Sequence, residues 1–512
     1  MPPPPNILLI TSDQQHWNTL GTINPRIRTP NLDRLARDGT QLDRTYCPNP
    51  VCSPSRASIL TGQYPSTHGC WTIGVKLPEE TRTVGHELAA AGYDTTLVGK
   101  AHFQPLLSLP GSESIECQPT LRDLDFWRGF HGPWYGFDHV ETARMHGNES
   151  HVGQHYAIWM EERGLANWRD YFQQFPPVPD DKYAGPYYTR DAQAWDLPEE
   201  FHHSCWVGER TVANIERSAR SGRPFFLWSS FFDPHPPYVV PEPWASAYEP
   251  DQMPWGTLEP GELDRLPPHF ALTQQADPDF SAYDEPGGHA LHGFHSHRHG
   301  LAEMRRSMAC YYGMIGLMDR EIGRILDSLD RLGIAENTLV VFTTDHGHFL
   351  GQHGLIAKGP FHYEDLLRLP FLARFPARIP AGTRSDALCS LVDLAPTFLS
   401  AAGLPIPGRM QGVDQLPVWT GDRDSARAHV LVENRHNPTR MHLRTLVTDT
   451  HKITVYRDGD FGELWDLASD PEERRNLWND PAAATLKSAM LLRLARAEIE
   501  REPTAMPRIA GA

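Results

Sequence analysis

The chain has 512 residues, 40% of them hydrophobic, and a formal net charge of −17 at pH 7. This apolar content excludes an intrinsically disordered chain. The negative charge argues against a nucleic-acid or anionic-membrane partner, because both require clustered positive charge. An anionic small-molecule substrate stays compatible with it, since a few cations focused in a pocket outweigh a distant negative surface.

Two further features bear on the compartment. No apolar run approaches the roughly 20 residues that span a bilayer, so we expect no membrane segment. The N-terminal residues 1–5 lead directly into an apolar stretch and lack the basic start and cleavage site of a secretory signal, which favours a cytoplasmic location. The seven cysteines are odd in number and scattered, and they indicate neither a disulfide framework nor a C-x-x-C zinc pattern.

Strand-like and helix-like segments alternate along most of the chain. Helices are predicted from Thr29-Pro30, over residues 84–91 and over residues 308–332, where apolar side chains recur at spacings of three and four. Buried strands are predicted at residues 6–11, 93–98, 224–232 and 338–344. This alternation predicts an α/β fold with a large, mostly parallel or mixed sheet flanked by helices.

The pattern changes after about residue 380, and we divide the chain into a catalytic domain, residues 1–380, and a C-terminal subdomain, residues 381–512. In the subdomain we expect a smaller antiparallel sheet with strands at 429–433, 444–448 and 452–456, and a closing helix at 482–500. Residues 240–300 are rich in Pro, Gly, Asp and His and form a predicted long insertion. We interpret its five clustered histidines as a solvated loop in preference to a metal-binding tract: His289, His292, His295, His297 and His299.

Reactive residues follow four of the predicted strands. They come in chain order as Asp13 with Gln14, Lys100 with His102, Asp233 with His235, and Asp345 with His346. In parallel α/β sheets, ligands lie beyond the carboxyl ends of the strands. Each strand end taken alone is compatible with an ordinary turn, but the four together predict one shared site.

The types of these residues indicate a metal and an anion. Asp13, Asp345 and His346 form a predicted divalent-metal site, in which the single imidazole favours Mn²⁺ or Zn²⁺ over Ca²⁺ without deciding. The remaining groups are cationic or can donate protons: Lys100, His102, His235 and Lys358. A metal among several cations is typical of a site for a tetrahedral oxyanion such as sulfate or phosphate.

Cys52 is the predicted nucleophile. Ser53 is a good helix cap and Pro54 suits the first helical position, so Cys52 is expected at or just before a helix N-terminus. The partial positive charge there lowers a thiol pKa, and Arg56 follows one turn into the same helix. These residues indicate an activated nucleophile beside a metal.

With these residues in place, the chain resembles the formylglycine-dependent sulfatases of the alkaline phosphatase superfamily. The resemblance rests first on the C-x-P-x-R motif at Cys52-Ser53-Pro54-Ser55-Arg56, continuing to Gly62. It extends nearly end to end through segments in family order: Asp13, Thr29-Pro30-Asn31-Leu32-Asp33, Gly99-Lys100 with His102, Asp233-Pro234-His235, Asp345-His346-Gly347, Lys358, Glu463-Leu464-Trp465-Asp466-Leu467, Asp470-Pro471-Glu472 and Asn476-Leu477.

The resemblance implies a cofactor set and a chemistry. A separate maturation enzyme would oxidise Cys52 to formylglycine, and Asp13, Cys52, Asp345 and His346 would ligate one divalent metal, with Ca²⁺ or Mn²⁺ expected. An oxygen of the hydrated aldehyde would attack sulfur and displace the alcohol. Its second hydroxyl then allows the covalent intermediate to break down without water attacking sulfur.

It also implies a role for each remaining residue. Arg56 and Lys100 would hold the formylglycine and stabilise its alkoxide. Lys358 and His235 would contact the sulfate, and one of them would protonate the leaving group. His102 would take the proton that releases sulfate and restores the aldehyde.

Two departures from the family pattern narrow the branch. Many members carry a second Asp after the first and an Asn after the later Asp, where this chain has Gln14 and His346. This variant resembles the choline sulfatases and phosphonate monoester hydrolases, and it leaves Gln14 as a substrate-binding residue or an extra ligand. We expect a sulfuric ester hydrolase acting on a small sulfate monoester. The alternatives are a hydrolase of phosphonate monoesters or phosphodiesters with the same nucleophile and a non-catalytic metal-binding protein, and a homo-oligomer is left open.

Overall fold

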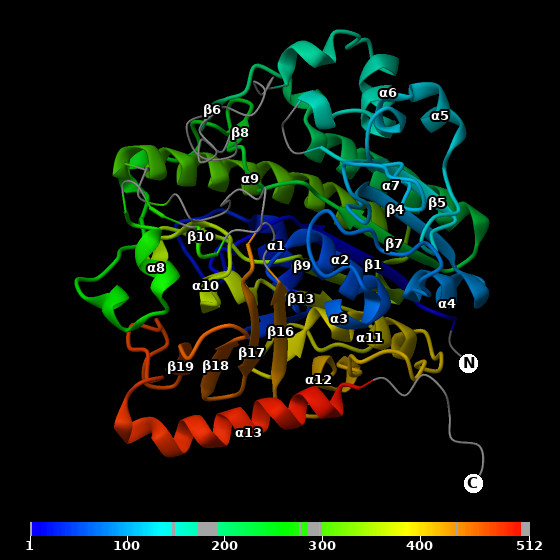
Figure 1. Cartoon of the computed structure of the whole chain (residues 1–512). Coiled ribbons are helices and arrows are strands. Elements are labelled where there is room, and N and C mark those ends of the chain that lie inside the picture. Colours follow the sequence, from blue (N-terminus) through cyan, green and yellow to red (C-terminus); the bar gives the residue numbers. More distant parts are fainter. Residues whose placement is uncertain are drawn as a thin grey trace, which may run out of the picture.

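An eight-stranded sheet forms the centre of the computed structural model, which describes residues 3–145, 149–172, 192–275, 278–279, 281–283, 296, 300–435 and 439–502 (Figure 1). Its strands follow the order β14 (Thr383–Ser385), β2 (Thr40–Leu42), β13 (Leu372–Arg374), β9 (Thr338–Thr344), β1 (Asn6–Ser12), β7 (Phe225–Ser230), β4 (Asp94–Lys100) and β5 (His139–Ala143). Within this sheet β13 alone runs antiparallel to its neighbours. The predicted α/β class with a mostly parallel, mixed sheet is confirmed.

The central strand β1 illustrates why strands of the large sheet are apolar at successive positions and do not alternate between apolar and polar residues. Ile7 and Leu9 face one hydrophobic core, whereas Leu8 and Ile10 face the other. Because both faces are covered, each position is buried, as in other parallel sheets with helices on both sides. The strand is therefore continuously apolar from Ile7 to Ile10, and the first charged residue, Asp13, falls at its carboxyl end.

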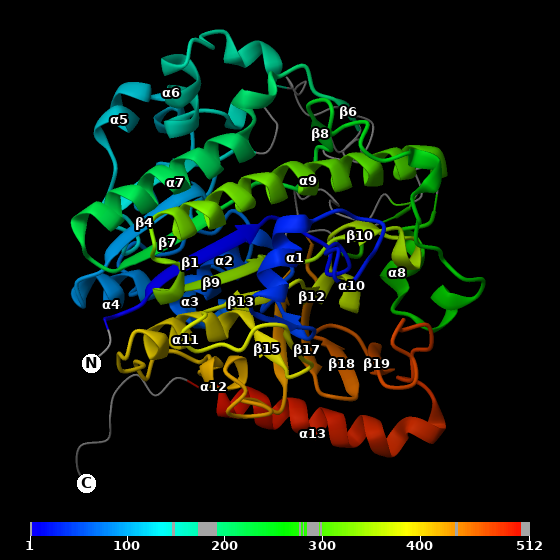
Figure 2. The same ribbon diagram turned by 180° about the vertical axis from the view of Figure 1, so that it is seen from behind.

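Helices cover the two faces of the sheet. The long α9 (Leu301–Arg331) and α7 (His203–Ser221) lie together on one face, with α1 (Pro30–Arg37) beside α9 (Figure 2). The other face is covered by α2 (Cys52–Thr61), α4 (Val84–Ala90) and α11 (Leu394–Ala401). The helix α11 and the strand β14 both come after residue 380, and both pack with the large sheet.

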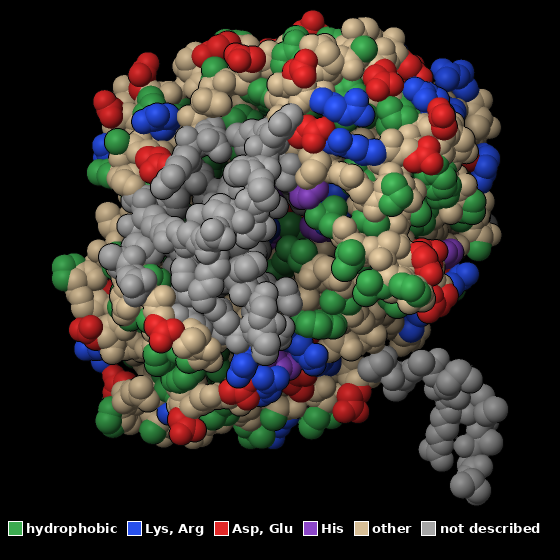
Figure 3. All heavy atoms as spheres, turned by 45° about the horizontal axis from the view of Figure 1, so that its top comes forward, with side chains coloured by type: hydrophobic (Ala, Val, Ile, Leu, Met, Phe, Trp, Pro, Cys, Tyr) green, Lys and Arg blue, Asp and Glu red, His purple; other side chains and the backbone are tan. Residues whose placement is uncertain are grey.

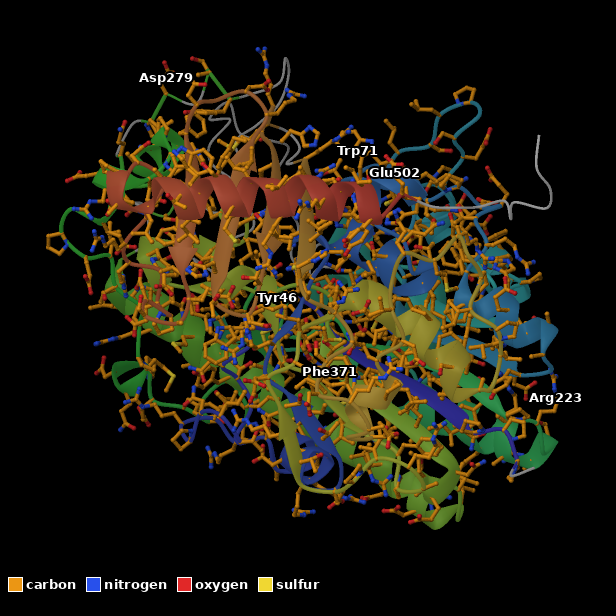
Figure 4. The ribbon with its side chains drawn as sticks, turned by 90° about the horizontal axis from the view of Figure 1, so that it is seen from below. Tyr46, Trp71, Arg223, Asp279, Phe371 and Glu502 are labelled. Atoms are coloured by element: carbon orange, nitrogen blue, oxygen red, sulfur yellow. The ribbon has the colours of Figure 1, made fainter. Side chains whose placement is uncertain are left out.

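A second, smaller sheet of four antiparallel strands lies near the C-terminus of the chain. It runs in chain order through β16 (Val430–Arg435), β17 (His442–Val447), β18 (His451–Tyr456) and β19 (Gly462–Asp466). The helix α13 (Ala484–Glu500) lies across it, and Figure 4 shows this arrangement from below. Met490 and Leu494 of α13 pack on the sheet's apolar side chains. The predicted small sheet and closing helix are confirmed, and β19 is a strand that the periodicity did not reveal.

The remaining elements are short and connect these layers. They are β3 (Thr45–Tyr46), α3 (Pro65–His68), α5 (Leu124–Gly129), α6 (Gln154–Glu162), β6 (Gln193–Ala194), β8 (Val239–Val240), α8 (Pro268–Leu272), β10 (Phe349–Leu350), β11 (Ile356–Ala357), α10 (Glu364–Leu367), β12 (Arg368–Leu369), β15 (Cys389–Ser390) and α12 (Leu416–Trp419). Among the described residues, no helix has the length and apolar character to cross a membrane.

The described part of the predicted insertion, residues 240–300, packs against the hairpin of β10 and β11. The Gly256 N–H donates to Leu350 O at 3.2 Å, and Glu262 pairs with both His353 and Arg474. The insertion thereby links the hairpin that precedes Lys358 to the C-terminal segment. The five clustered histidines lie outside the described residues.

Candidate active site

The sheet register brings the predicted strand ends together. Ser12 of β1 pairs with Thr344 of β9, so the next residues, Asp13 and Asp345, emerge side by side. On the other side of β1, Thr11 pairs with Ser230 of β7. The Asp13 N–H donates to Asp233 O at 3.0 Å, which ties the loop after β7 to the same place. The carboxyl ends of β1, β9 and β7 therefore meet at one edge of the sheet, where parallel sheets bind ligands.

Four potential metal ligands converge there. Asp13, Cys52, Asp345 and His346 are all buried, and each offers one ligand atom within 4.8 Å of the others. Cys52 Sγ lies 3.1 Å from His346 Nε2 and 3.8 Å from Asp13 Oδ1. Two carboxylates, one imidazole and one further donor suit a divalent cation, so the residues present fit the metal that the sequence implies. We call this group the strand-end cluster.

The orientation of His346 supports that reading. Its Nδ1 lies 3.0 Å from Gly347 O, which can only accept, so Nδ1 carries the proton. Its Nε2, which faces the cluster, therefore presents a lone pair to a cation. Burial lowers the pKa of His346 to about 4, so the imidazole is neutral at pH 7. A neutral imidazole held by a backbone carbonyl is the usual arrangement of a metal-ligating histidine.

Gln14 is built into the same cluster. Its backbone has a positive φ of 62°, an uncommon conformation that places its N–H 3.0 Å from Asp345 Oδ1. Its side-chain Nε2 donates to His348 Nδ1 at 2.8 Å. Its Oε1 is buried and has no hydrogen-bond partner among the described residues. A buried amide oxygen with no donor is available as an extra ligand or as an acceptor for substrate.

Arg56 and Asp345 form a fully buried ion pair at the base of the cluster. Arg56 Nε donates to Asp345 Oδ2 at 2.9 Å, and its Nη1 donates to Ser230 Oγ at 2.7 Å and to Lys100 O at 3.0 Å. Burial opposes ionisation of Asp345, but the positive charges of Arg56 and Lys100 and the hydrogen bond from the Gln14 N–H outweigh it and hold its pKa below the ordinary value. Arg56 thus holds one of the four potential metal ligands and contacts residues at the ends of three strands.

Cys52 lies in the first turn of α2, whose N-cap is Val51. The prediction of a helix start at Cys52 is confirmed, but Ser53 as the cap is wrong, because the helix begins two residues earlier than a Ser53 cap implies. Cys52 is 1% exposed, and Lys358 Nζ donates to its Sγ at 3.2 Å. Burial alone raises the thiol pKa, but the charges of Lys100 and Lys358 outweigh it and lower the pKa of Cys52.

Lys100 and Lys358 contact different members of the cluster. Lys100, the last residue of β4, makes a buried ion pair with Asp13 Oδ2. Lys358 follows β11 and also lies 3.4 Å from His346 Nε2. With Arg56, these two side chains place three cations around two carboxylates. The centre is therefore suited to bind a further anion.

His102 and His235 complete the set. His102 has a positive φ of 63°, and its N–H donates to Glu116 Oε1 at 3.0 Å. Burial and the charges of Arg144, Lys100 and Arg56 hold the pKa of His102 well below the ordinary value. His235 is only partly buried, and burial together with nearby Lys358 and Lys100 lowers its pKa to about 4. All ten predicted site residues thus belong to one region of the molecule.

The structure adds supporting residues that the sequence did not single out. His348 Nε2 lies 2.7 Å from Tyr238 OH, and its ring stacks on Tyr311. Tyr311 OH donates to Gln14 O at 2.8 Å. Glu116 accepts three successive N–H groups, from His102, Phe103 and Gln104, and so shapes the turn after β4. His348 follows His346 by two residues, and this proximity is the feature of the sequence that could have indicated its supporting role.

The space-filling view shows a hollow in the surface, with histidine and hydrophobic side chains visible in it (Figure 3). A small pocket on the described surface is lined by His203, His235 and mainly apolar side chains. His235 is therefore a site residue that borders a pocket.

Comparisons with known proteins agree with this geometry. A sequence model of the sulfatase family matches residues 5–404, and one described as "N-sulphoglucosamine sulphohydrolase, C-terminal" matches residues 351–500. An arylsulfatase of Clostridium perfringens is 28% identical, over 93% of this chain and 90% of the relative. A choline-sulfatase of Rhizobium meliloti is 26% identical, over 97% and 87%.

A comparison with a solved structure supports the same fold. The phosphonate monoester hydrolase SpPMH from Silicibacter pomeroyi superposes with a TM-score of 0.79 at 24% identity, covering 98% of this chain and 96% of that one. Fold and site together define an enzyme of the alkaline phosphatase superfamily. The chain belongs to the sulfatase family. The predicted resemblance is confirmed, and both named neighbours of the predicted branch are found among the similar proteins.

Proposed function

We propose that this chain hydrolyses sulfate monoesters with one divalent metal and a formylglycine made from Cys52. The observation that carries the proposal is the convergence of Asp13, Cys52, Asp345 and His346 within 4.8 Å, with the Lys358 ammonium 3.2 Å from the Cys52 sulfur. This arrangement combines a nucleophile position, a cation site and anion-binding groups. Members of the sulfatase family generally use the same combination.

The metal would be held by Asp13, Asp345, His346 and the modified Cys52, with Gln14 as a candidate extra ligand. When bound, such an ion polarises an oxygen nucleophile and neutralises charge on a sulfate oxygen. Carboxylates suit a hard cation and the neutral imidazole suits Mn²⁺, and the family resemblance implies Ca²⁺ or Mn²⁺. Arg56 helps to keep Asp345 ionised and holds it in place, and Lys100 makes an ion pair with Asp13.

The burial of Cys52 limits the stage at which this residue can be modified. In the folded chain the residue is 1% exposed and lies beneath Lys358 and His346, so no enzyme can reach it there. We therefore expect the maturation enzyme to act before folding is complete. The hydrated aldehyde would provide one hydroxyl for attack and a second for release of the product.

The remaining residues act on protons and on the anion. Lys358 and His235 would contact the sulfate, because both border the Cys52 sulfur. A pKa of about 4 leaves His235 neutral at pH 7, which favours Lys358 as the donor to the leaving alcohol. His102, whose pKa is also held low, is neutral and suited to accept the proton that releases sulfate.

A second activity has specific support. Gln14 replaces an anionic side chain with a neutral one beside Asp345, which lowers the negative charge next to the substrate. A lower charge suits phosphonate monoesters and phosphodiesters as well as sulfate monoesters, since all three carry one negative charge. We propose these substrates as secondary. The domain boundary at residue 380, a cytoplasmic location and the oligomeric state stay predictions.

The test is the ratio of kcat/KM for an aryl sulfate and a phenylphosphonate monoester of the same phenol. Protein produced together with a maturation enzyme should prefer the sulfate. The matched control is Cys52→Ala, which measures contaminating hydrolase activity. A clear preference for the phosphonate would overturn the assignment.

A further inference from the structure

A second group of buried metal-ligand side chains lies next to the strand-end cluster. His202 is the N-cap of α7, His203 is its first residue, and Asp233 follows β7. All three are buried, and each offers one ligand atom within 4.8 Å of the others. His203 Nε2 lies 3.8 Å from Asp233 Oδ1, and His202 Nδ1 lies 3.9 Å from Asp233 Oδ2. We call these three residues the His202 cluster.

The cluster leaves polar atoms without partners. Asp233 Oδ1, His202 Nε2 and His203 Nδ1 are buried with no hydrogen-bond partner among the described residues. The carboxylate receives one hydrogen bond, from Ser204 Oγ, and the described lysines and arginines form no ion pair with it. Burial raises the pKa of Asp233 to about 8, so the group stays protonated until a cation takes the place of the proton.

We propose that the His202 cluster is a second site for a divalent transition-metal cation, ligated by His203, Asp233 and an imidazole nitrogen of His202. Two imidazoles and one carboxylate are a donor set that zinc and manganese accept. The 3.8 Å separation of His203 Nε2 and Asp233 Oδ1 suits two ligands of one ion. His202 Nδ1, 3.9 Å from Asp233 Oδ2, accepts the Ser204 N–H at 3.2 Å, so His202 must give up this hydrogen bond or turn its ring to become the third ligand. Three protein ligands leave a position open for water or a small ligand.

The surroundings supply what a metal site needs beyond its ligands. The Ser204 hydroxyl donates to Asp233 Oδ2 and orients the carboxylate. Trp195 packs against both imidazoles, with ring centroids 5.5 and 6.1 Å away. A small pocket lined by His203, His235, Met145 and Met314 borders the cluster and offers a route of entry.

An ion bound at the His202 cluster would also affect the neighbouring strand-end cluster. Asp233 O accepts the Asp13 N–H at 3.0 Å, and His235 follows Asp233 by two residues. A cation on Asp233 would therefore hold the segment that positions both residues. This inference goes beyond the proposed function and does not rest on it, since the ligands and their geometry are independent of the reaction.

The test is the number of Zn²⁺ equivalents retained by the full chain after stripping with chelator, reloading with Zn²⁺ alone and equilibrium dialysis. We expect two for the wild type, one for His203→Gln, one for Asp345→Asn and none for the double variant. The matched control is His155→Gln, a buried histidine hydrogen-bonded to Phe130 O outside both clusters, which should retain two. One equivalent in the wild type, or no loss in His203→Gln, would overturn the proposal.

Two further measurements keep the proposal testable should His203→Gln fail to fold. Ser204→Ala retains all three ligands and removes only the hydrogen bond to Asp233, so the second equivalent should bind about 10- to 100-fold more weakly while the first is unchanged. The wild type loaded with ¹¹³Cd²⁺ should give two NMR signals, of which Asp345→Asn abolishes one. Equal weakening of both equivalents, or a single signal in the wild type, contradicts a second site.

Discussion

The strand-end cluster and the His202 cluster lie one hydrogen bond apart, yet they differ in charge. The first combines two carboxylates with three cations, Arg56, Lys100 and Lys358. The second has a single carboxylate between two imidazoles, without a described lysine or arginine ion-paired to it. Similar ligand types thus have different surroundings: the surplus of cations suits the first cluster to anions, whereas the second lacks such a surplus and is the one that we propose for a cation.

The largest expected effect comes from a comparison of two cysteine variants. One cysteine belongs to the strand-end cluster, and the other lies close in sequence to the His202 cluster. Cys52→Ala removes the nucleophile and should lower kcat by at least about 10⁴-fold, as loss of a covalent nucleophile does in other hydrolases. Cys205→Ala, two residues beyond His203 in α7, removes a buried thiol beside the His202 cluster and should retain turnover. Steady-state assays with an aryl sulfate and far-UV circular dichroism measure both. Substantial activity in Cys52→Ala would place the chemistry elsewhere.

The next effect concerns the surplus cations. Lys358→Ala removes the ammonium nearest Cys52 and should lower kcat by about 10² to 10³-fold, more for alcohols that leave poorly. His235→Ala should be milder and depend less on the leaving group, because this imidazole is already neutral at pH 7. A series of aryl sulfates with different phenol pKa values separates the two. A steeper leaving-group dependence in His235→Ala would reverse the assignment of the proton donor.

His102→Ala should slow release of sulfate more than cleavage of the ester, since His102 is assigned to the second step. Rapid-mixing experiments should therefore show a burst of phenol, followed by a steady rate about 10²-fold lower than in the wild type. The control is His151→Ala, another buried histidine with a lowered pKa that has no assigned role. A slow first turnover without a burst would assign His102 to cleavage.

The smallest effect is a pH dependence of stability. His68 supports α2 by contacting Ser58 Oγ at 3.0 Å, and burial lowers its pKa to about 3. Since the unfolded chain takes up this proton first, the contribution of His68 is full above pH 6.5 and is lost as the pH falls towards 3. Between pH 7 and pH 5 the loss is about 2 kcal/mol. The drop in Tm between pH 7 and pH 5 should be smaller in His68→Gln than in the wild type. An unchanged drop would show that His68 does not cause this loss of stability.

Much of the strand-end cluster was predictable from sequence. Buried apolar runs end at Asp13 and Asp345, and the rule for parallel sheets then places both at one edge. The contacts between Arg56 and Asp345 and between Lys100 and Asp13 were not predictable, because register and rotamers decide which cation meets which carboxylate.

The His202 cluster could not be predicted from sequence. Nothing in a His-His pair before a helix indicates that the helix will start against the end of β7. The same limit applies to α2, where Ser53 has the right chemistry for a cap but Val51 occupies that position. Local preference yields to packing when a helix start is wholly buried.

The most direct test of the account is the mass of the peptide that contains Cys52, taken from protein made with a maturation enzyme and assayed in parallel. The account predicts that this peptide carries an aldehyde in place of the thiol and that sulfatase turnover rises in proportion to the converted fraction. Full turnover by protein whose Cys52 is an unmodified thiol would contradict it.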